Sequence, residues 1–319
     1  GLQFVAGIVS VEGEAELLAA AEQLVLETTD ATQPWDRKGF SVPGGAGFMG
    51  PEPGATFNLA ATQIARDTQR NYPAPIALLT AVARGTAVPM DAGLHVESCE
   101  FAKLLMDPVA RNLMRTLFVS KGELDKLARR PQGVAPASLK TIGVIGAGLM
   151  GAGVAHVSAL AGFDVLMLDA SLANAQAGKQ RLADGFAKQI GRGRMLQEKA
   201  DAILARITPV EDYARLANCD LVVEAVFEDR KVKSAVFEKL EAVLKPGAII
   251  ATNTTSLPAT GLADGLKRPA SFIGLHFFSP VDRMALVEVI KGKDTSEETL
   301  AHALDFIKCL RKTPIIVND

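Results

Sequence analysis

From residue 141 onward, short apolar runs alternate with longer segments in which apolar residues recur at helical spacing. The apolar runs are residues 141–146, 165–169, 220–226, 248–253, 271–277 and 285–290, and the helical segments are 149–162, 171–188 and 230–244. Strands that are apolar throughout need cover on both faces, which interleaved helices supply. We therefore predict an α/β domain with a doubly wound, mainly parallel sheet.

A glycine cluster joins the first predicted strand to the first predicted helix. It reads GAGLMG, and Gly146, Gly148 and Gly151 give the G-x-G-x-x-G spacing. Glycines at this spacing let the backbone N–H groups of a helix N-terminus face a pyrophosphate, although a structural turn explains the bare pattern equally well. The second predicted strand ends at Asp169, 18 residues after Gly151. An acid at that point accepts hydrogen bonds from the adenosine ribose.

Together, the glycines and the acid predict a Rossmann-type dinucleotide site, with Leu149 and Met150 inside its turn. Asp169 would repel a 2′-phosphate, and no arginine follows it directly, so we expect NAD rather than NADP. The alternative for Asp169 is a helix N-terminal cap, a role that Ser171 can fill alone.

Polar residues also follow or interrupt three later strands, near the edge where ligands bind in such sheets. Residues 253–256 read NTTS, His276 ends the next apolar run, and Glu288 lies inside the last one. If the chain turns back as a hairpin centred near Asp282, His276 and Glu288 face one another, with Cβ atoms roughly 4.5–5.5 Å apart. The carboxylate would then orient the imidazole as a general base for a hydroxyl proton. An ordinary polar pair in the core is the alternative.

The first part of the chain has a different character. Helical spacing occurs at residues 17–27, 60–70, 75–85, 91–106 and 107–121. The proline- and glycine-rich residues 33–55 are expected to form an extended connector, and residues 128–140 a second one. We place the domain boundary near residue 135, which divides the chain into 1–134 and 135–319.

Composition excludes several classes of partner. Thirty-four basic and 36 acidic residues leave a net charge of −2, which provides no basic field for nucleic acid or a membrane surface. The most apolar long stretch, 144–168, contains glycines, His156 and Asp164, so a strand, helix and strand are expected there rather than a membrane span. The cysteines are odd in number and far apart, which fits neither a disulfide framework nor a metal site and favours the cytoplasm. The opening residues lack a signal peptide's pattern, and Gly1 suggests a piece of a longer chain.

Four segments resemble signatures of the 3-hydroxyacyl-CoA dehydrogenase family, across residues 139–319: GAGLMG, VVEAVFEDRKVK, ATNTTSL and GLHFFSPVDRMALVEVI. The resemblance implies NAD-dependent oxidation of (3S)-3-hydroxyacyl-CoA to 3-ketoacyl-CoA in fatty-acid β-oxidation. It implies that His276 is the general base, that Glu288 is its partner, and that Thr255 contacts the substrate oxygen. Glu228 and Lys233 match positions that line the cofactor site, the alternative for both being an exposed helix charge.

Two positions depart from the family's pattern. The family usually carries serine where this chain has Thr255, so a hydroxyl is kept, and asparagine where it has Ser279, so an amide is lost at an expected cofactor contact. Ser256 is a second expected substrate contact. A basic run after the long helix matches residues that meet the CoA phosphates, a solvated face being equally compatible: Lys188, Arg192 and Arg194.

Residues 1–24 and 95–118 resemble the closing strand and C-terminal helices of an enoyl-CoA hydratase, or crotonase-like, domain. Such a domain is fused to the dehydrogenase in the alpha subunit of the fatty acid oxidation complex, which implies a thiolase subunit as partner. The hydratase glutamates would lie upstream, so Glu97 and Glu100 are expected to be solvated helix charges.

The dehydrogenase's catalytic asparagine and its C-terminal domain would follow the last residue, so the piece is expected to bind NAD with little turnover. A non-catalytic scaffold segment is one alternative. Another Rossmann β-hydroxyacid dehydrogenase is the other, although we find no segment with the helical lysine that those enzymes use.

Overall fold

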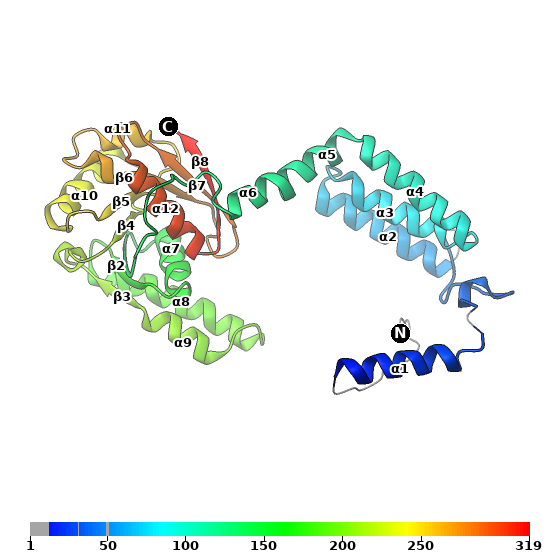
Figure 1. Ribbon diagram of the computed structural model, residues 1–319. Coiled ribbons are helices and arrows are strands. Elements are labelled where there is room, and N and C mark those ends of the chain that lie inside the picture. The colour runs from blue at the N-terminus through cyan, green and yellow to red at the C-terminus, as the bar shows by residue number, and fades with distance from the viewer. Residues whose placement is uncertain (1–12, 31, 49–50) are drawn as a thin grey trace. The chain divides into compact units, whose positions relative to one another are not determined.

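The computed structural model describes residues 13–30, 32–48 and 51–319, and the chain divides into two compact units after Val119. The first unit is helical in its described part, and the second contains the sheet (Figure 1). The closing strand expected within residues 1–12 lies outside the described residues.

Each helical segment predicted in the first unit is confirmed. The unit contains α1 (Glu14–Glu27), η1 (Pro34–Asp36), α2 (Pro51–Thr68), α3 (Pro73–Gly85), α4 (Met90–Met106), α5 (Pro108–Met114) and most of η2 (Arg115–Ser120). The predicted connector over 33–55 is wrong at its end, because α2 already begins at Pro51. A helix accepts proline in its first turn, where the backbone N–H has no intrahelical partner.

The first unit has little core of its own. Among its described residues, the one buried hydrophobic residue is Ala83 on α3. Glu97 is exposed as expected, but the same expectation for Glu100 is wrong. Glu100 is buried on α4, where its carboxylate pairs with Lys103 Nζ at 2.7 Å and Arg84 Nη1 at 3.7 Å.

The second unit is a mainly parallel α/β domain, as predicted. Its elements are α6 (Lys121–Asp125), β1 (Thr141–Ile145), α7 (Leu149–Leu160), β2 (Asp164–Leu168), α8 (Leu172–Gly191), α9 (Gln197–Ala205), β3 (Ile207–Val210), η3 (Tyr213–Leu216), β4 (Leu221–Glu224), α10 (Arg230–Val243), β5 (Ile249–Thr252), α11 (Ala259–Ala263), η4 (Pro269–Ser271), β6 (Phe272–Phe277), β7 (Leu286–Lys291), α12 (Glu297–Cys309) and β8 (Thr313–Asn318). The strand order is β3-β2-β1-β4-β5-β6-β7-β8, and only the β6–β7 pair is antiparallel. The order reverses between β1 and β4, where Rossmann sheets bind dinucleotides.

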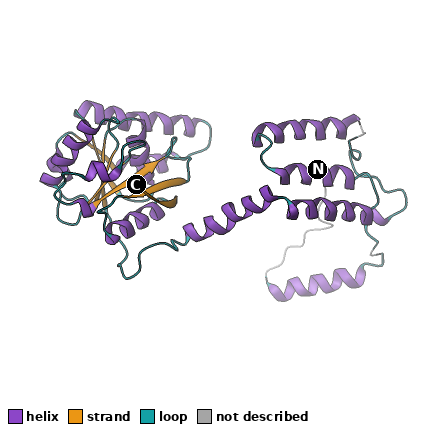
Figure 2. Ribbon diagram, turned by 90° about the horizontal axis from the view of Figure 1, so that it is seen from above, coloured by secondary structure: helices purple, strands orange, loops and turns teal. Residues whose placement is uncertain are grey.

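Helices cover both faces of this sheet (Figures 1 and 2). Val154 of α7, Phe186 of α8 and Ile307 of α12 belong to the core on one face. Phe237 of α10 and Leu262 of α11 belong to the core on the other. The strand, helix and strand expected over 144–168 are confirmed, and no helix in the described part of the chain is long and apolar enough to span a bilayer.

The two outermost strands, β3 and β8, were not predicted from the sequence. Each contains a proline, Pro209 or Pro314, which cannot donate a ladder hydrogen bond. Edge strands tolerate this loss because one side of the strand has no neighbour.

The connector expected over 128–140 is attached to the sheet-bearing unit. The Arg130 guanidinium forms two hydrogen bonds with Asp305 of α12, at 2.7 and 2.8 Å. The compact unit that contains the sheet begins at Ser120 and so includes this connector. The assignment of 1–134 to a hydratase remnant stays a prediction.

Candidate active site

Three glycines shape the turn after β1. Gly146 has φ +93°, and a Cβ there would lie 2.5 Å from the Ala225 carbonyl oxygen. A Cβ on Gly151 would lie 1.7 Å from the carbonyl oxygen of Gly146. A Cβ on Gly148, in contrast, would meet nothing within 4 Å. The first and third glycines are therefore required by the fold, whereas the middle one leaves open space above the turn.

This open space is where the sequence predicts a dinucleotide phosphate. The N-terminus of α7 begins beside it, and the first N–H groups of a helix have no intrahelical partners and carry partial positive charge. Gly148 and Leu149 are exposed, and Met150 is half-buried.

Asp169 connects the end of β2 to the glycine turn. Its carboxylate accepts hydrogen bonds from the backbone N–H groups of Ala147 and Ala170, both at 2.7 Å. Ser171 is the residue that caps α8, accepting from Asn174 N at 3.2 Å, so the capping alternative for Asp169 is wrong. Asn174 Nδ2 also donates to the Asp169 carboxylate, at 3.2 Å. An ionised carboxylate has about four acceptor positions, so about one remains for a ribose hydroxyl.

The predicted hairpin is confirmed. His276 and Glu288 are direct cross-strand partners in β6 and β7, and His276 Nδ1 lies 2.7 Å from Glu288 Oε2. An ionised carboxylate can only accept, so Nδ1 carries the hydrogen and Nε2 is the ring nitrogen that can take up a proton. The side chains are 15% and 31% exposed, so the pair is partly accessible to solvent.

The strand register places His276 on the same face of the sheet as two buried polar residues, Glu224 and Thr252. Glu224 pairs with Thr252, and Thr252 pairs with Gly274. Alternate residues along a strand share a face, so His276 lies on the face of Glu224 and Thr252, two residues nearer the carboxyl end. Asn253 Oδ1 accepts from the backbone N–H of Phe277 at 2.8 Å, which joins the end of β5 to the residue after His276.

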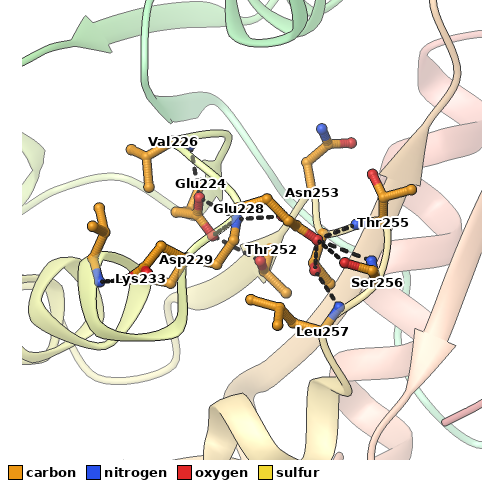
Figure 3. A network of polar contacts seen from close by, with 12 residues as sticks. Glu224, Val226, Glu228, Asp229, Lys233, Thr252, Asn253, Thr255, Ser256 and Leu257 are labelled. Atoms are coloured by element: carbon orange, nitrogen blue, oxygen red, sulfur yellow. Dashed lines mark hydrogen bonds and ion pairs between the residues drawn. The ribbon is translucent and has the colours of Figure 1, made fainter.

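A buried ion pair supports this face of the sheet (Figure 3). Lys233 of α10 and Glu224 of β4 are both 0% exposed, with Lys233 Nζ at 2.8 and 3.0 Å from the two carboxylate oxygens. Thr252 Oγ1 donates to the same carboxylate at 2.7 Å, and Val226 N does so at 2.7 Å. The alternative of an exposed helix charge is therefore wrong for Lys233.

Glu228, in the loop after β4, accepts several hydrogen bonds from the loop after β5. Its Oε1 accepts from Thr254 Oγ1 at 2.6 Å, Thr255 N at 2.8 Å, Ser256 N at 2.9 Å and Ser256 Oγ at 3.2 Å. Its Oε2 lies 3.4 Å from Lys233 Nζ. Burial raises the pKa of Glu228, but the hydrogen bonds from these three residues and the charge of Lys233 outweigh burial and lower the pKa to about 2.

Five of the expected site residues lie along one edge of the sheet. Asp169, Gly148, Glu228, Thr255 and His276 lie at or near the carboxyl ends of five consecutive strands, β2, β1, β4, β5 and β6. Other expected contacts are exposed side chains that stay predictions: Ser279 in the β6–β7 loop, and Lys188, Arg192 and Arg194 at and after the end of α8.

Glu224 and Thr252 were not predicted from the sequence as part of this site. A usable signal was present, because Glu224 is an acid inside the apolar run 220–226, which is the feature that singled out Glu288. Such an acid needs a partner.

Comparisons with known proteins agree with this geometry. The family model described as "3-hydroxyacyl-CoA dehydrogenase, NAD binding domain" matches residues 141–319. The fatty acid oxidation complex subunit alpha of Pseudomonas paraeruginosa is 40% identical over 263 residues, which are 82% of this chain and 36% of that protein. The chain therefore spans just over a third of the length of the curated relatives it matches.

Two solved structures are similar in sequence and fold. (S)-3-Hydroxybutyryl-CoA dehydrogenase from Ralstonia eutropha is 37% identical with a TM-score of 0.56, covering 57% of this chain and 64% of that one. 3-Hydroxybutyryl-CoA dehydrogenase from Escherichia coli K12 is 36% identical with a TM-score of 0.55, covering 57% and 39%. The glycine turn, the strand order and the family match together show that this chain belongs to the 3-hydroxyacyl-CoA dehydrogenase family, whose NAD binding domain it contains.

Proposed function

We propose that the sheet-bearing unit is the NAD-binding half of an enzyme that oxidises (3S)-3-hydroxyacyl-CoA to 3-ketoacyl-CoA in fatty-acid β-oxidation. The observation that carries this proposal is the His276–Glu288 pair, with 2.7 Å between Nδ1 and Oε2, on the sheet edge that also carries the glycine turn. The family match and the dehydrogenase relatives support the same reaction.

The chemistry is a paired loss of a proton and a hydride. His276 Nε2 takes the proton of the 3-hydroxyl group, the C3–O bond becomes a carbonyl, and Glu288 stabilises the imidazolium through Nδ1. NAD+, when bound, supplies the hydride acceptor for the hydrogen of C3. The Thr255 hydroxyl holds the substrate oxygen. General-base contributions of this type are worth roughly 10²–10⁴-fold in rate.

The proposed cofactor contacts lie on the same edge of the sheet. Gly146, Gly148 and Gly151 shape the turn for the pyrophosphate, and Asp169 accepts from the ribose. The same carboxylate disfavours a 2′-phosphate, which makes NAD the cofactor. Leu149, Met150 and Ser279 complete the proposed contacts, and Ser256, Lys188 and Arg192 are proposed to meet the acyl-CoA.

For the protein as a whole, we propose an alpha subunit of the fatty acid oxidation complex that works with a thiolase subunit in the cytoplasm. Residues 1–134 are the end of an enoyl-CoA hydratase domain in this proposal, and 135–319 belong to the dehydrogenase. The match to the Pseudomonas subunit supports it, because 263 matched residues extend well upstream of residue 141. Cys99, Cys219 and Cys309 are free thiols, as in a reducing compartment.

The natural full-length protein tests the reaction directly. NADH oxidation with acetoacetyl-CoA is followed for the wild type and for His276→Gln, with His95→Gln as a matched control at an exposed histidine of α4. We expect His276→Gln to lose at least about 10²-fold in kcat. An unchanged rate removes His276 as the base. An inactive wild type that binds its partners favours a scaffold.

A further inference from the structure

The loop after β5 carries three consecutive residues with hydroxyl groups, Thr254, Thr255 and Ser256. Two of these hydroxyl groups already donate hydrogen bonds within the protein. Thr254 Oγ1 and Ser256 Oγ donate to Glu228 at 2.6 and 3.2 Å. Thr255 gives Glu228 only its backbone N–H, at 2.8 Å, and its exposed side chain points away from that carboxylate (Figure 3). One hydroxyl is thus left for a ligand, at a position that the other groups fix.

Glu228 is built as a clamp for this loop. A single carboxylate oxygen receives donors from three successive residues, and hydrogen bonds to an ionised acceptor are about twice as strong as neutral ones. The pKa of about 2 keeps the carboxylate ionised throughout the neutral range. The loop therefore loses several contacts at once if Glu228 moves.

The clamp is itself anchored in the core. Lys233 is 0% exposed and lies between Glu224, at 2.8 Å, and Glu228, at 3.4 Å. Displacing Glu228 removes one of the two carboxylates that neutralise a buried ammonium group, which is energetically unfavourable. The buried ammonium group of Lys233 therefore holds the Glu228 carboxylate in place.

The other side of the loop is tied to the proposed base. Asn253 Oδ1 accepts from Phe277 N at 2.8 Å, and Phe277 follows His276 in β6. The loop that carries Thr255 is thus held by contacts on two sides, one with Glu228 and one with Phe277 at the end of β6. A reacting group that shifts by about 1 Å can lose roughly 10²-fold in rate, so such fixation has a catalytic consequence.

We propose that Glu228 is a positioning residue that acts through Thr255: its carboxylate holds residues 254–256 so that the Thr255 hydroxyl meets the substrate oxygen above His276. The inference rests on the proposed dehydrogenase function. It goes beyond the expectation that Glu228 is a cofactor contact, because all four donors from the β5 loop meet a single oxygen, Oε1, of its carboxylate.

A double-mutant cycle in the natural full-length protein tests the coupling. The wild type, Glu228→Gln, Thr255→Val and the double variant are compared for kcat and KM with acetoacetyl-CoA and for the Kd of NADH. We expect Glu228→Gln to lower kcat about tenfold in the wild type and less than about twofold in the Thr255→Val background. The Kd of NADH should stay within about twofold, because the proposed role acts on the substrate oxygen through Thr255.

Two further variants serve as a control and as a substitute for Glu228→Gln. Glu238→Gln, at an exposed carboxylate of α10, is the matched control and should leave kcat unchanged. Thr254→Val removes one clamp donor without altering the buried charges, and serves if Glu228→Gln does not fold. Its loss of kcat should be smaller and should also vanish in the Thr255→Val background.

The outcomes separate the inference from the function on which it rests. An active wild type in which the two substitutions multiply independently overturns the positioning role alone. A large rise in the Kd of NADH for Glu228→Gln, with kcat unchanged, makes Glu228 a cofactor contact and also overturns it. A wild type without turnover overturns the proposed function and the inference together.

Discussion

Replacing Lys233 by methionine is expected to lower the free energy of unfolding of the sheet-bearing unit by about 3–5 kcal/mol. Both Lys233 and Glu224 are 0% exposed, so the substitution leaves a carboxylate in the core without its counter-ion. Only Val226 N and Thr252 Oγ1 still donate to that carboxylate. Methionine is unbranched like lysine and fills similar space, so the loss comes from the uncompensated charge rather than from a cavity.

A second substitution isolates the electrostatic part. Glu224→Gln removes the charge, keeps an acceptor oxygen for Val226 N, and places an amide NH2 group where the Thr252 hydroxyl can accept from it. The double variant Glu224→Gln/Lys233→Met should therefore regain most of the stability, to within about 1–2 kcal/mol of the wild type. Lys231→Met, at an exposed position of α10, is the matched control and should change stability by less than about 0.5 kcal/mol.

The assay has to report on the correct unit. Trp35, the chain's single tryptophan, lies in the helical unit, so its fluorescence does not follow the sheet. Urea denaturation should be followed by circular dichroism, with hydrogen exchange of peptides from β4 and β5 measured by mass spectrometry. A loss below about 1 kcal/mol for Lys233→Met, or a double variant less stable than the single one, would refute this account of the pair.

Three further predictions concern the sheet edge. Gly151→Ala should prevent folding of the sheet-bearing unit, because its Cβ would lie 1.7 Å from the Gly146 carbonyl oxygen, whereas Gly148→Leu should fold and weaken NAD binding at least about tenfold in calorimetric titration. Glu288→Gln should lower kcat by roughly 10²-fold in steady-state kinetics with the Kd of NADH unchanged, because the His276 ring loses its ionised partner. The pKa of Glu228 is lowered from 4.5 to about 2, so its contribution to stability is complete above pH 4.5 and lost as the pH falls towards 2. In urea titrations the stability difference between wild type and Glu228→Gln should shrink over that interval, and a constant difference would contradict the assignment.

The sequence was sufficient to predict the inner strands of the sheet and the pairing of His276 with Glu288. Apolar runs covered by helices identify β1, β2 and β4–β7, because a strand buried on both faces has a composition that few other structures share. The opposition of His276 and Glu288 followed from counting residues around the hairpin, since register in an antiparallel pair is fixed by its turn. Local pattern therefore determined this part of the site.

The remainder depended on contacts between distant residues. Lys233 is spaced with Val236, Phe237 and Leu240 on the buried face of α10, but its charge made an exposed position the natural alternative. The pairing with Glu224 of β4 becomes evident only once α10 packs on the sheet. Glu228 likewise gathers residues about 26 positions away, which no local pattern indicates.

The central claim is that one sheet edge holds both the dinucleotide turn and the base that acts on the substrate hydroxyl. Single-turnover transfer from (3S)-3-hydroxybutyryl-CoA carrying deuterium at C3 tests this claim most directly, with the natural full-length protein and NAD+ and with mass spectrometry of the reduced cofactor. We predict that the deuterium appears in the reduced cofactor and that His276→Gln slows its transfer by at least about 10²-fold. Reduced cofactor without deuterium, or transfer at the wild-type rate in His276→Gln, would contradict the claim.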